Sequence, residues 1–315
     1  MSRRTAVDLH LHSKYSDGED SIRDLVLLAK ATAEQKFDGL SRLVISIADH
    51  DTLAGQREAL EWGKKFDVET IPSSELTTTH ERQNPHILFY FSASRLDEVE
   101  DNKELGMIFK KNRDIRKEKD RRILSGLRAK GFNLTYNELE LVRPKNSVGG
   151  TPYIVMVLLK KYHDLEKRHI DDVFALVKEI EKSTRKDSSL QYLNLVSTTK
   201  ILREAKVVPC LAHPLLNNLR SVRGLAYSFF MLGGGLGAEY YYPYHHFKKT
   251  SSINIDHYQK EIDRICAESE RIKTGGSDYH GRHFRDKRNL FDVEVPYWVA
   301  DKLLEKIDNV EKGRV

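Results

Sequence analysis

The chain has 315 residues, of which 39% are hydrophobic and 31% charged, and its formal net charge is +5. No apolar run approaches the roughly 20 residues that a membrane-spanning helix requires, and two cysteines, Cys210 and Cys266, are too few for a disulfide scaffold. The modest positive charge permits an anionic substrate but does not by itself indicate nucleic-acid binding. Because a strand is predicted directly after Met1–Arg4, we expect no signal peptide, no membrane partner and a cytoplasmic protein.

The first predicted strand carries two histidines on one face. Residues 6–12 alternate apolar and polar side chains with a period of two, which is typical of a strand. His10 and His12 therefore point the same way, and the turn at 16–18 brings Asp17 back toward them. This arrangement favours a metal site, although a pair of half-buried histidines is the simpler interpretation of the stretch taken alone.

Strands and helices alternate through the first third of the chain. Helical spacing predicts a helix over 21–36 and another over 53–64, with a continuous apolar strand over 43–48 between them. Polar side chains follow at the expected strand ends: His50, Glu75 and His86. The ends of strands carry the chemistry in parallel α/β barrels, so this pattern predicts such a barrel.

The alternation stops between 102 and 190, where charged, helix-forming residues dominate. We expect a helical insertion over the barrel mouth, dividing the barrel into residues 1–101 and 191–315. Its first helix is strongly basic from Lys110 to Arg122. This run is either an ordinary solvated helix face or a positive lid that attracts phosphates.

The strand–helix pattern resumes after 195. A buried strand over 207–212 ends at His213, and a strand over 237–243 ends near His245. The last predicted strand leads into Asp278 and His280.

The polar residues at predicted strand ends form one set of candidate metal ligands. They are His10, His12, Asp17, His50, Glu75, His86, His213, Asp278 and His280. Imidazole nitrogen with carboxylate oxygen, and no thiolate, favours ions such as Zn, Mn or Fe. Nine ligands exceed one tetrahedral site, so two or three divalent ions are expected. Asp49 and Asp51 are expected to orient a histidine ring or to cap the next helix.

Several motifs resemble those of the PHP (polymerase and histidinol phosphatase) family, in the order in which that family has them. Residues 8–18 match D-x-H-x-H-S-x-x-S-D-G, and Gly237–Pro243 is similar to the G-x-E-x-Y-Y-P segment of its stand-alone phosphoesterase branch. The other matching segments are 48–52, 74–76, 86–88, 212–214 and 276–281. The resemblance implies a distorted, TIM-like (β/α)7 barrel with a trinuclear metal centre at the C-terminal ends of its strands.

Carried over residue by residue, the resemblance divides the ligands among three ions. The first ion would take His10, His12, Glu75 and Asp278. Glu75 would bridge to a second ion bound by His86 and His213, and Asp17, His50 and His280 would bind the third. Two ions about 3.5–4 Å apart can clamp the attacking and leaving oxygens of phosphoryl transfer, here with a metal-bridging hydroxide as the nucleophile.

One departure from the family pattern concerns substrate binding. The family run G-R-x-H-x-A-R, which resembles a set of phosphate ligands, is replaced here by residues 150–156. Its arginine, histidine and second arginine positions are occupied by Thr151, Tyr153 and Met156. Basic residues elsewhere could bind the substrate phosphate instead: Arg113, Arg116, Arg143 and Lys145.

The leading hypothesis is a metal-dependent phosphoesterase acting on a nucleotide, a nucleoside bisphosphate or the 5′ end of a short oligonucleotide. Glu75 would be a catalytic residue that bridges the metals. His245 could protonate the leaving alkoxide, although it could equally be a surface turn residue. A histidinol-phosphate-type phosphatase and a non-catalytic PHP binding module are the alternatives. The sequence does not indicate the oligomeric state.

Overall fold

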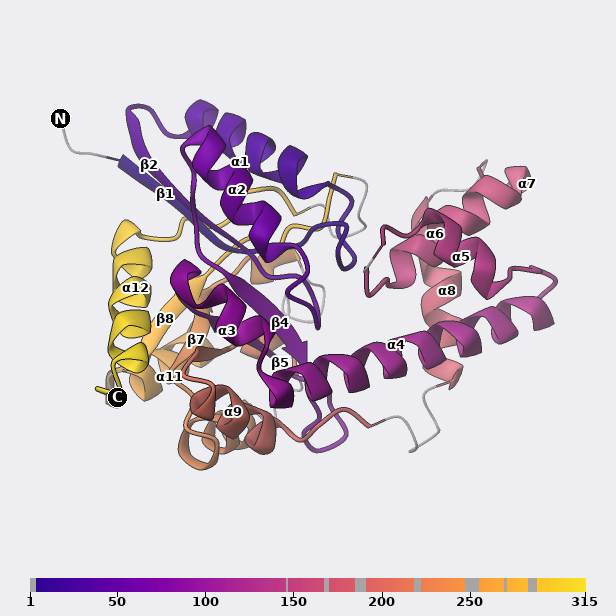
Figure 1. Ribbon diagram of the computed structural model, residues 1–315. Helices are drawn as coiled ribbons and strands as arrows, with labels where there is room; N and C mark the ends of the chain where they lie inside the picture. The colour runs from indigo at the N-terminus through magenta and orange to yellow at the C-terminus, as the bar shows by residue number, and fades with distance from the viewer. Residues whose placement is uncertain are drawn as a thin grey trace.

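The strands lie together in one part of the fold, as Figure 1 shows for the computed structural model. Among the residues that the structure describes, eight strands form two sheets. The structure describes residues 4–145, 147–166, 170–184, 191–217, 222–246, 255–268, 271–282 and 288–315. The strands are β1 (Arg4–Leu11), β2 (Leu40–Ile47), β3 (Glu69–Thr70), β4 (Ser73–Thr77), β5 (His86–Tyr90), β6 (Val208–Leu211), β7 (Gly237–Tyr241) and β8 (Ile272–Gly275). The predicted mixed α/β class is confirmed.

The two sheets have the strand orders β1-β2-β3 and β4-β5-β6-β7-β8. All pairs are parallel except those of β5, which runs antiparallel to both β4 and β6. The expectation of parallel strands throughout is wrong at β5, because the short loop 78–85 joins it to β4 without a crossover helix. Isolated bridges between Leu11 and Tyr279 and between His50 and Glu75 link the two sheets. A closed seven-stranded barrel stays a prediction.

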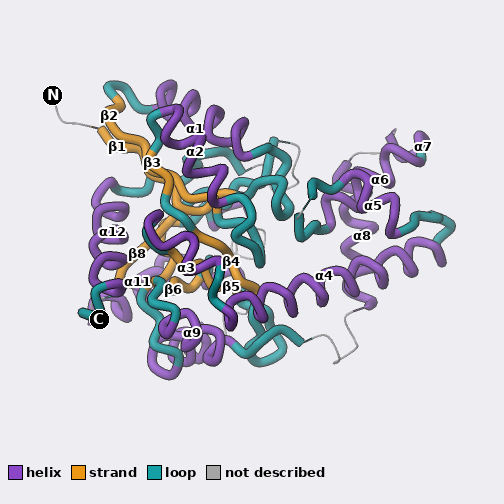
Figure 2. Tube along the Cα trace, in the orientation of Figure 1, coloured by secondary structure: helices purple, strands orange, loops and turns teal. Residues whose placement is uncertain are grey.

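Helices pack on the outer faces of these strands (Figures 1 and 2). Helix α1 contacts β2 and α2, α11 contacts β7 and β8, and α12 contacts β1, β6 and β8. Their bounds are α1 (Ile22–Lys36), α2 (Gln56–Phe66), α3 (Leu96–Glu100), α9 (Leu195–Glu204), α10 (Val222–Tyr227), α11 (Ile255–Glu268) and α12 (Tyr297–Glu311). Among the helices described, none combines the length and apolar character needed to cross a membrane.

Local signals explain where the first two helices begin. The hydroxyl of Ser21 accepts a hydrogen bond from the Asp24 backbone N–H, so Ser21 rather than Asp20 caps α1. Helix α2 begins at Gln56, later than predicted. The Gln56 side chain donates to the Ile47 carbonyl at 2.7 Å and accepts from the Ser73 N–H, which fixes the helix start against β2 and β4.

The segment between β5 and β6 is helical, and Figure 1 shows most of it at the end of α4 remote from the sheets. It contains α4 (Lys103–Ala129), α5 (Tyr136–Val142), α6 (Thr151–Lys161), α7 (His163–Glu166) and α8 (Ile170–Thr184). These helices enclose a separate apolar cluster that includes Leu127, Leu158 and Val177. Helices α4 and α8 approach closely at Gly126, where a Cβ atom would lie 2.4 Å from Ile180 Cγ2.

This second cluster predicts a stability effect on α6. Leu158 is fully buried, and replacing it with alanine should lower the free energy of unfolding by about 2–5 kcal/mol. Met156→Ala is the matched control, because Met156 lies on the same helix but is 47% exposed, and we expect a change within about 0.5 kcal/mol. Urea denaturation followed by circular dichroism measures both. Equal transitions for Leu158→Ala and the wild type would show that this cluster does not stabilise the fold.

Candidate metal centre

The two histidines of the first strand are fully buried and converge on one point. His10 Nδ1 donates to Glu239 Oε1 at 3.0 Å, so the lone pair of His10 is on Nε2. His10 Nε2 lies only 3.1 Å from His12 Nε2. Two ring nitrogens this close either share a proton in a hydrogen bond or direct their lone pairs at one cation, so the pair is suited to a cation site.

The loop after β1 is shaped by one carboxylate and one glycine. Asp49 accepts hydrogen bonds from the Ser13 N–H and from the hydroxyls of Ser13 and Ser16, at 2.6–2.8 Å. At Gly18 a Cβ atom would lie 2.2 Å from the His12 carbonyl oxygen, so only glycine allows this close turn. The turn directs Asp17 back toward the histidines.

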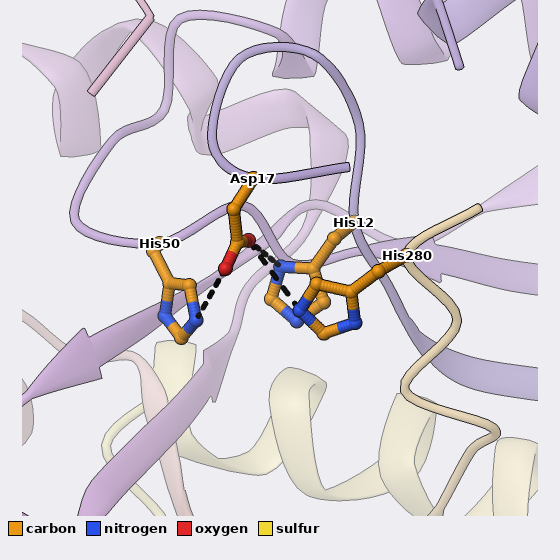
Figure 3. Close-up of side chains that lie close together, drawn as sticks. All are labelled: His12, Asp17, His50 and His280. Atoms are coloured by element: carbon orange, nitrogen blue, oxygen red, sulfur yellow. Dashed lines mark ion pairs between the residues drawn. The ribbon is translucent and has the colours of Figure 1, made fainter. Parts of the chain in front are cut away.

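Asp17 faces three imidazoles, as Figure 3 shows. Its Oδ1 lies 3.4 Å from His280 Nε2 and 3.8 Å from His12 Nδ1. Its Oδ2 lies 3.9 Å from His50 Nε2. His280 Nδ1 donates to the carbonyl of Asp278 at 2.7 Å, so the lone pair of this ring points toward Asp17.

Glu75 on β4 is the centre of the site, and its side chain is 1% exposed. Five imidazoles from four segments of the chain surround its carboxylate. Oε2 lies 3.2–3.3 Å from ring nitrogens of His10, His12 and His50. Oε1 lies 2.8 Å from His86 Nδ1 and 2.9 Å from His213 Nε2. A carboxylate with ring nitrogens on both oxygens can bridge two cations.

Asp278 contacts the histidines with one oxygen and polar residues with the other. Its Oδ1 lies 3.0 Å from His12 Nε2 and 3.4 Å from His10 Nε2. Its Oδ2 accepts hydrogen bonds from Tyr242 Oη, at 2.8 Å, and from Arg288 Nη1. These two donors fix the carboxylate with Oδ1 toward the strand histidines.

The structure therefore brings all nine predicted ligands together. His12, Asp17, His50 and His280 form one group whose donor atoms lie within 4.8 Å of one another, and His10, His12, Glu75 and Asp278 form another. The second group is the set predicted for the first ion. A third group joins His50 to Glu75 and His86, whereas His213 contacts the set through Glu75. The division of ligands among three ions stays a prediction.

The protonation chemistry of these residues fits divalent cations. Burial would raise the pKa of Glu75, but His50, His86 and His10 hold it well below its usual value, so the carboxylate is ionised. Burial lowers the pKa of His50 to about 3, which leaves a neutral ring of the kind that binds metals. Although His12 is buried too, the carboxylates of Asp278 and Glu75 raise its pKa to about 9, so a metal would have to displace a proton from this ring. Asp17 Oδ1 and His50 Nδ1 are buried and make no hydrogen bond within the described structure. The donor set, which lacks thiolates, suits Zn, Mn or Fe.

The predicted substrate and acid residues do not line the cavity at the centre, although Arg116 is close enough to influence the charges of His50 and Asp17. Among the described residues, the cavity at the centre has a volume of about 200 Å³ and is lined by His50, Glu75, His86, His213, Leu216, Tyr242, Asp278, His280 and Arg288. Arg113, Lys145 and His245 are absent from this lining. His245 is exposed, beside His246 and Asp292.

Two predicted phosphate ligands form ion pairs that support the structure. Arg116 Nε donates to Asp51 Oδ2 at 2.7 Å, and Arg143 Nη2 donates to Asp120 Oδ2 at the same distance. Asp51 also accepts from the Thr77 N–H, so it joins α4 to β4. Neither Asp49 nor Asp51 caps α2, whose N-cap is Gly55.

Sequence reasoning assigned no role to two residues that hold ligands in place. Glu239 accepts from the His10 ring and, through Oε2, from the His213 backbone N–H at 2.8 Å. It lies within the G-x-E-x-Y-Y-P segment, which is a usable signal. Arg288 lies outside every motif, ten positions after Asp278, and only the three-dimensional structure identifies it.

Sequence comparisons with known proteins give one short match. No family model matches the sequence. A 5′-3′ exoribonuclease from Haemophilus influenzae is 38% identical over 81 residues, which make up 26% of this chain and 27% of that protein. The match thus spans about a quarter of the length of this relative.

Two solved structures resemble the chain over almost all of its length. One, from Bifidobacterium adolescentis, is provisionally described as a metal-dependent phosphoesterase; it has a TM-score of 0.73 at 21% identity and the match covers 97% of both chains. The other is an amidohydrolase from Chromobacterium violaceum with bound sulfate and no metal, with a TM-score of 0.70 at 18% identity over 96% of both chains. The chain therefore shares its fold with a protein described as a metal-dependent phosphoesterase and with one described as an amidohydrolase. Membership of the PHP family stays a prediction.

Proposed function

We propose that the chain is a metal-dependent phosphoesterase of the PHP type, which hydrolyses a phosphate ester of a nucleotide or of the 5′ end of a short oligonucleotide. The observation that carries this proposal is the convergence of five imidazoles on the buried carboxylate of Glu75. Asp17 and Asp278 add a carboxylate on either side of this group. A site of this composition is suited to several divalent ions rather than one.

The chain's own residues would divide the work between ligation and positioning. Two or three Mn, Fe or Zn ions, when bound, would activate water and stabilise the charge that develops on the phosphoryl oxygens. Glu239 holds the His10 ring in the tautomer whose Nε2 carries a lone pair. His245 stays a predicted proton donor, but its exposure favours the surface-turn interpretation.

Two observations support a nucleotide or oligonucleotide as the substrate. The curated relative described as a 5′-3′ exoribonuclease acts on RNA, although it matches only 81 residues. Helix α4 also presents exposed cations to solvent at Lys110, Lys111, Lys117 and Arg121. Such a surface attracts polyanions through long-range electrostatics.

A substrate panel tests the proposal directly. Mononucleotides, 3′,5′-bisphosphates, 5′-phosphorylated oligomers and histidinol phosphate would each be offered to the protein with Mn, Zn or Mg. We expect turnover of at least one nucleotidic ester. Turnover of histidinol phosphate alone would contradict the nucleotide assignment, and turnover of none with any metal would contradict the phosphoesterase.

Removing the central carboxylate should abolish activity. Glu75→Ala deletes the group that all five imidazoles share, so kcat for p-nitrophenyl phosphate with Mn should fall by more than about 100-fold, since even residues that only support ligands cost 10- to 100-fold. Glu305→Gln, an exposed change on α12, is the control and should keep wild-type turnover. Unchanged turnover in Glu75→Ala would refute the site.

Glu239→Gln should weaken metal binding without removing a ligand. A glutamine amide has one acceptor oxygen for two donors, so either His10 or the His213 N–H loses its partner. We expect Mn affinity to fall by about 10- to 100-fold, measured from free Mn by electron paramagnetic resonance. Glu311→Gln is the matched control, since Glu311 also accepts a backbone hydrogen bond, from Ser92, but lies outside the site. Equal affinities for Glu239→Gln and the wild type would refute this role.

A further inference from the structure

The proposed reaction needs a group that binds the substrate's phosphate, and the four predicted candidates lie outside the lining of the central cavity. Thr151, Tyr153 and Met156 occupy the positions of the family's basic residues. Arg116 and Arg143 form ion pairs with Asp51 and Asp120. None of the four predicted substitutes lines the cavity at the centre.

Arg288 is the one permanently charged cation among the described residues that line this cavity. It is 7% exposed, so it is a buried arginine rather than a surface one. Nη1 lies 3.0 Å from Tyr242 Oη and contacts Asp278 Oδ2. Nη2 lies 3.2 Å from His280 Nδ1, so the guanidinium spans two of the predicted metal ligands at the edge of the cavity.

The hydrogen bonds to Tyr242 Oη and Asp278 Oδ2 fix the direction of the guanidinium without using Asp278 Oδ1. That oxygen remains directed at His10 and His12, while Oδ2 binds the arginine. Asp278 can therefore bind a cation through Oδ1 while its Oδ2 orients Arg288. A guanidinium held in this way is pre-organised, and its planar fork matches the oxygens of a phosphate.

We propose that Arg288 binds the phosphate group of the substrate, in the cavity that it lines together with His50, His213 and His280. The inference rests on the proposed function and deepens it. The cavity volume of about 200 Å³ is smaller than the ≈ 300–1,000 Å³ typical of sites that enclose whole drug-sized ligands. It therefore takes a terminal phosphate, and the rest of a nucleotide or oligonucleotide lies outside it. Arg288 thus selects monoesters with a free phosphate end.

Phosphate binding, measured apart from turnover, tests the inference. Isothermal titration calorimetry of inorganic phosphate into Mn-loaded protein gives the affinity, and elemental analysis gives the Mn content of each variant. At Mn concentrations that fill the site in each protein, Arg288→Gln should lose about 10- to 100-fold in phosphate affinity, as expected for a hydrogen-bonded charge. Arg288→Lys keeps the positive charge but loses the planar guanidinium, so its phosphate affinity should lie between those of the wild type and Arg288→Gln.

The control is Arg57→Gln, an exposed arginine paired with Asp97 and Glu100 on the protein surface, and it should bind phosphate like the wild type. Unchanged phosphate affinity in Arg288→Gln would overturn the inference. So would a loss of phosphate affinity that is present at low Mn but absent once Mn fills the site, because Arg288 would then only position Asp278. Both outcomes leave the proposed function standing if the wild type still hydrolyses p-nitrophenyl phosphate; failure of the wild type to do so would instead overturn the phosphoesterase.

Discussion

The burial of Glu75 among five imidazoles is the interaction on which the rest of the site depends. An ionised carboxylate away from water is costly unless cations or donors compensate it. Glu75 obtains its compensation from β1, β5 and the loops after β2 and β6, so these segments must meet at one place. The carboxylates of Asp17 and Asp278, on either side of Glu75, likewise need cations or donors from other segments of the chain. The fold thus brings several buried carboxylates and imidazoles to one place, where divalent ions would compensate the carboxylates.

A second layer of carboxylates holds the segments in position. Asp49 shapes the loop of Asp17, and Asp51 joins β4 to α4. Asp8 accepts from the backbone N–H groups of Ser277 and Phe291 at 2.9 and 3.0 Å, which ties the first strand to the segments that follow the last one. Burial raises the pKa of Asp8 to about 6, so this link also carries a desolvation cost. Each acid is satisfied by donors from another part of the chain.

The sequence predicted those features that depend on local periodicity. The alternation of β1 placed His10 and His12 on one face, and the position of polar residues at strand ends identified all nine residues that converge. It did not predict that β5 is antiparallel, because strand direction depends on the connection and not on the strand itself. It also did not separate the arginines that support the structure from those that face the cavity. On α4, Asn112 and Arg116 are one turn apart and both bond Asp51, whereas neighbouring lysines face solvent, and composition alone does not distinguish them.

The same charge balance links metal binding to protonation. The groups around Asp17, Glu75 and Asp278 keep the pKa of each carboxylate well below its usual value, so all three are ionised. Among the described residues that line the cavity, Arg288 is the one permanent cation. The carboxylates of Asp278 and Glu75 raise the pKa of buried His12 to about 9, and carboxylates also raise the pKa of His10 and His213. Without metal, protons on these rings therefore offset the charge of the carboxylates. Divalent ions would take the place of these protons, because a ring nitrogen must be deprotonated to bind a metal, so metal binding and proton release at this site are coupled.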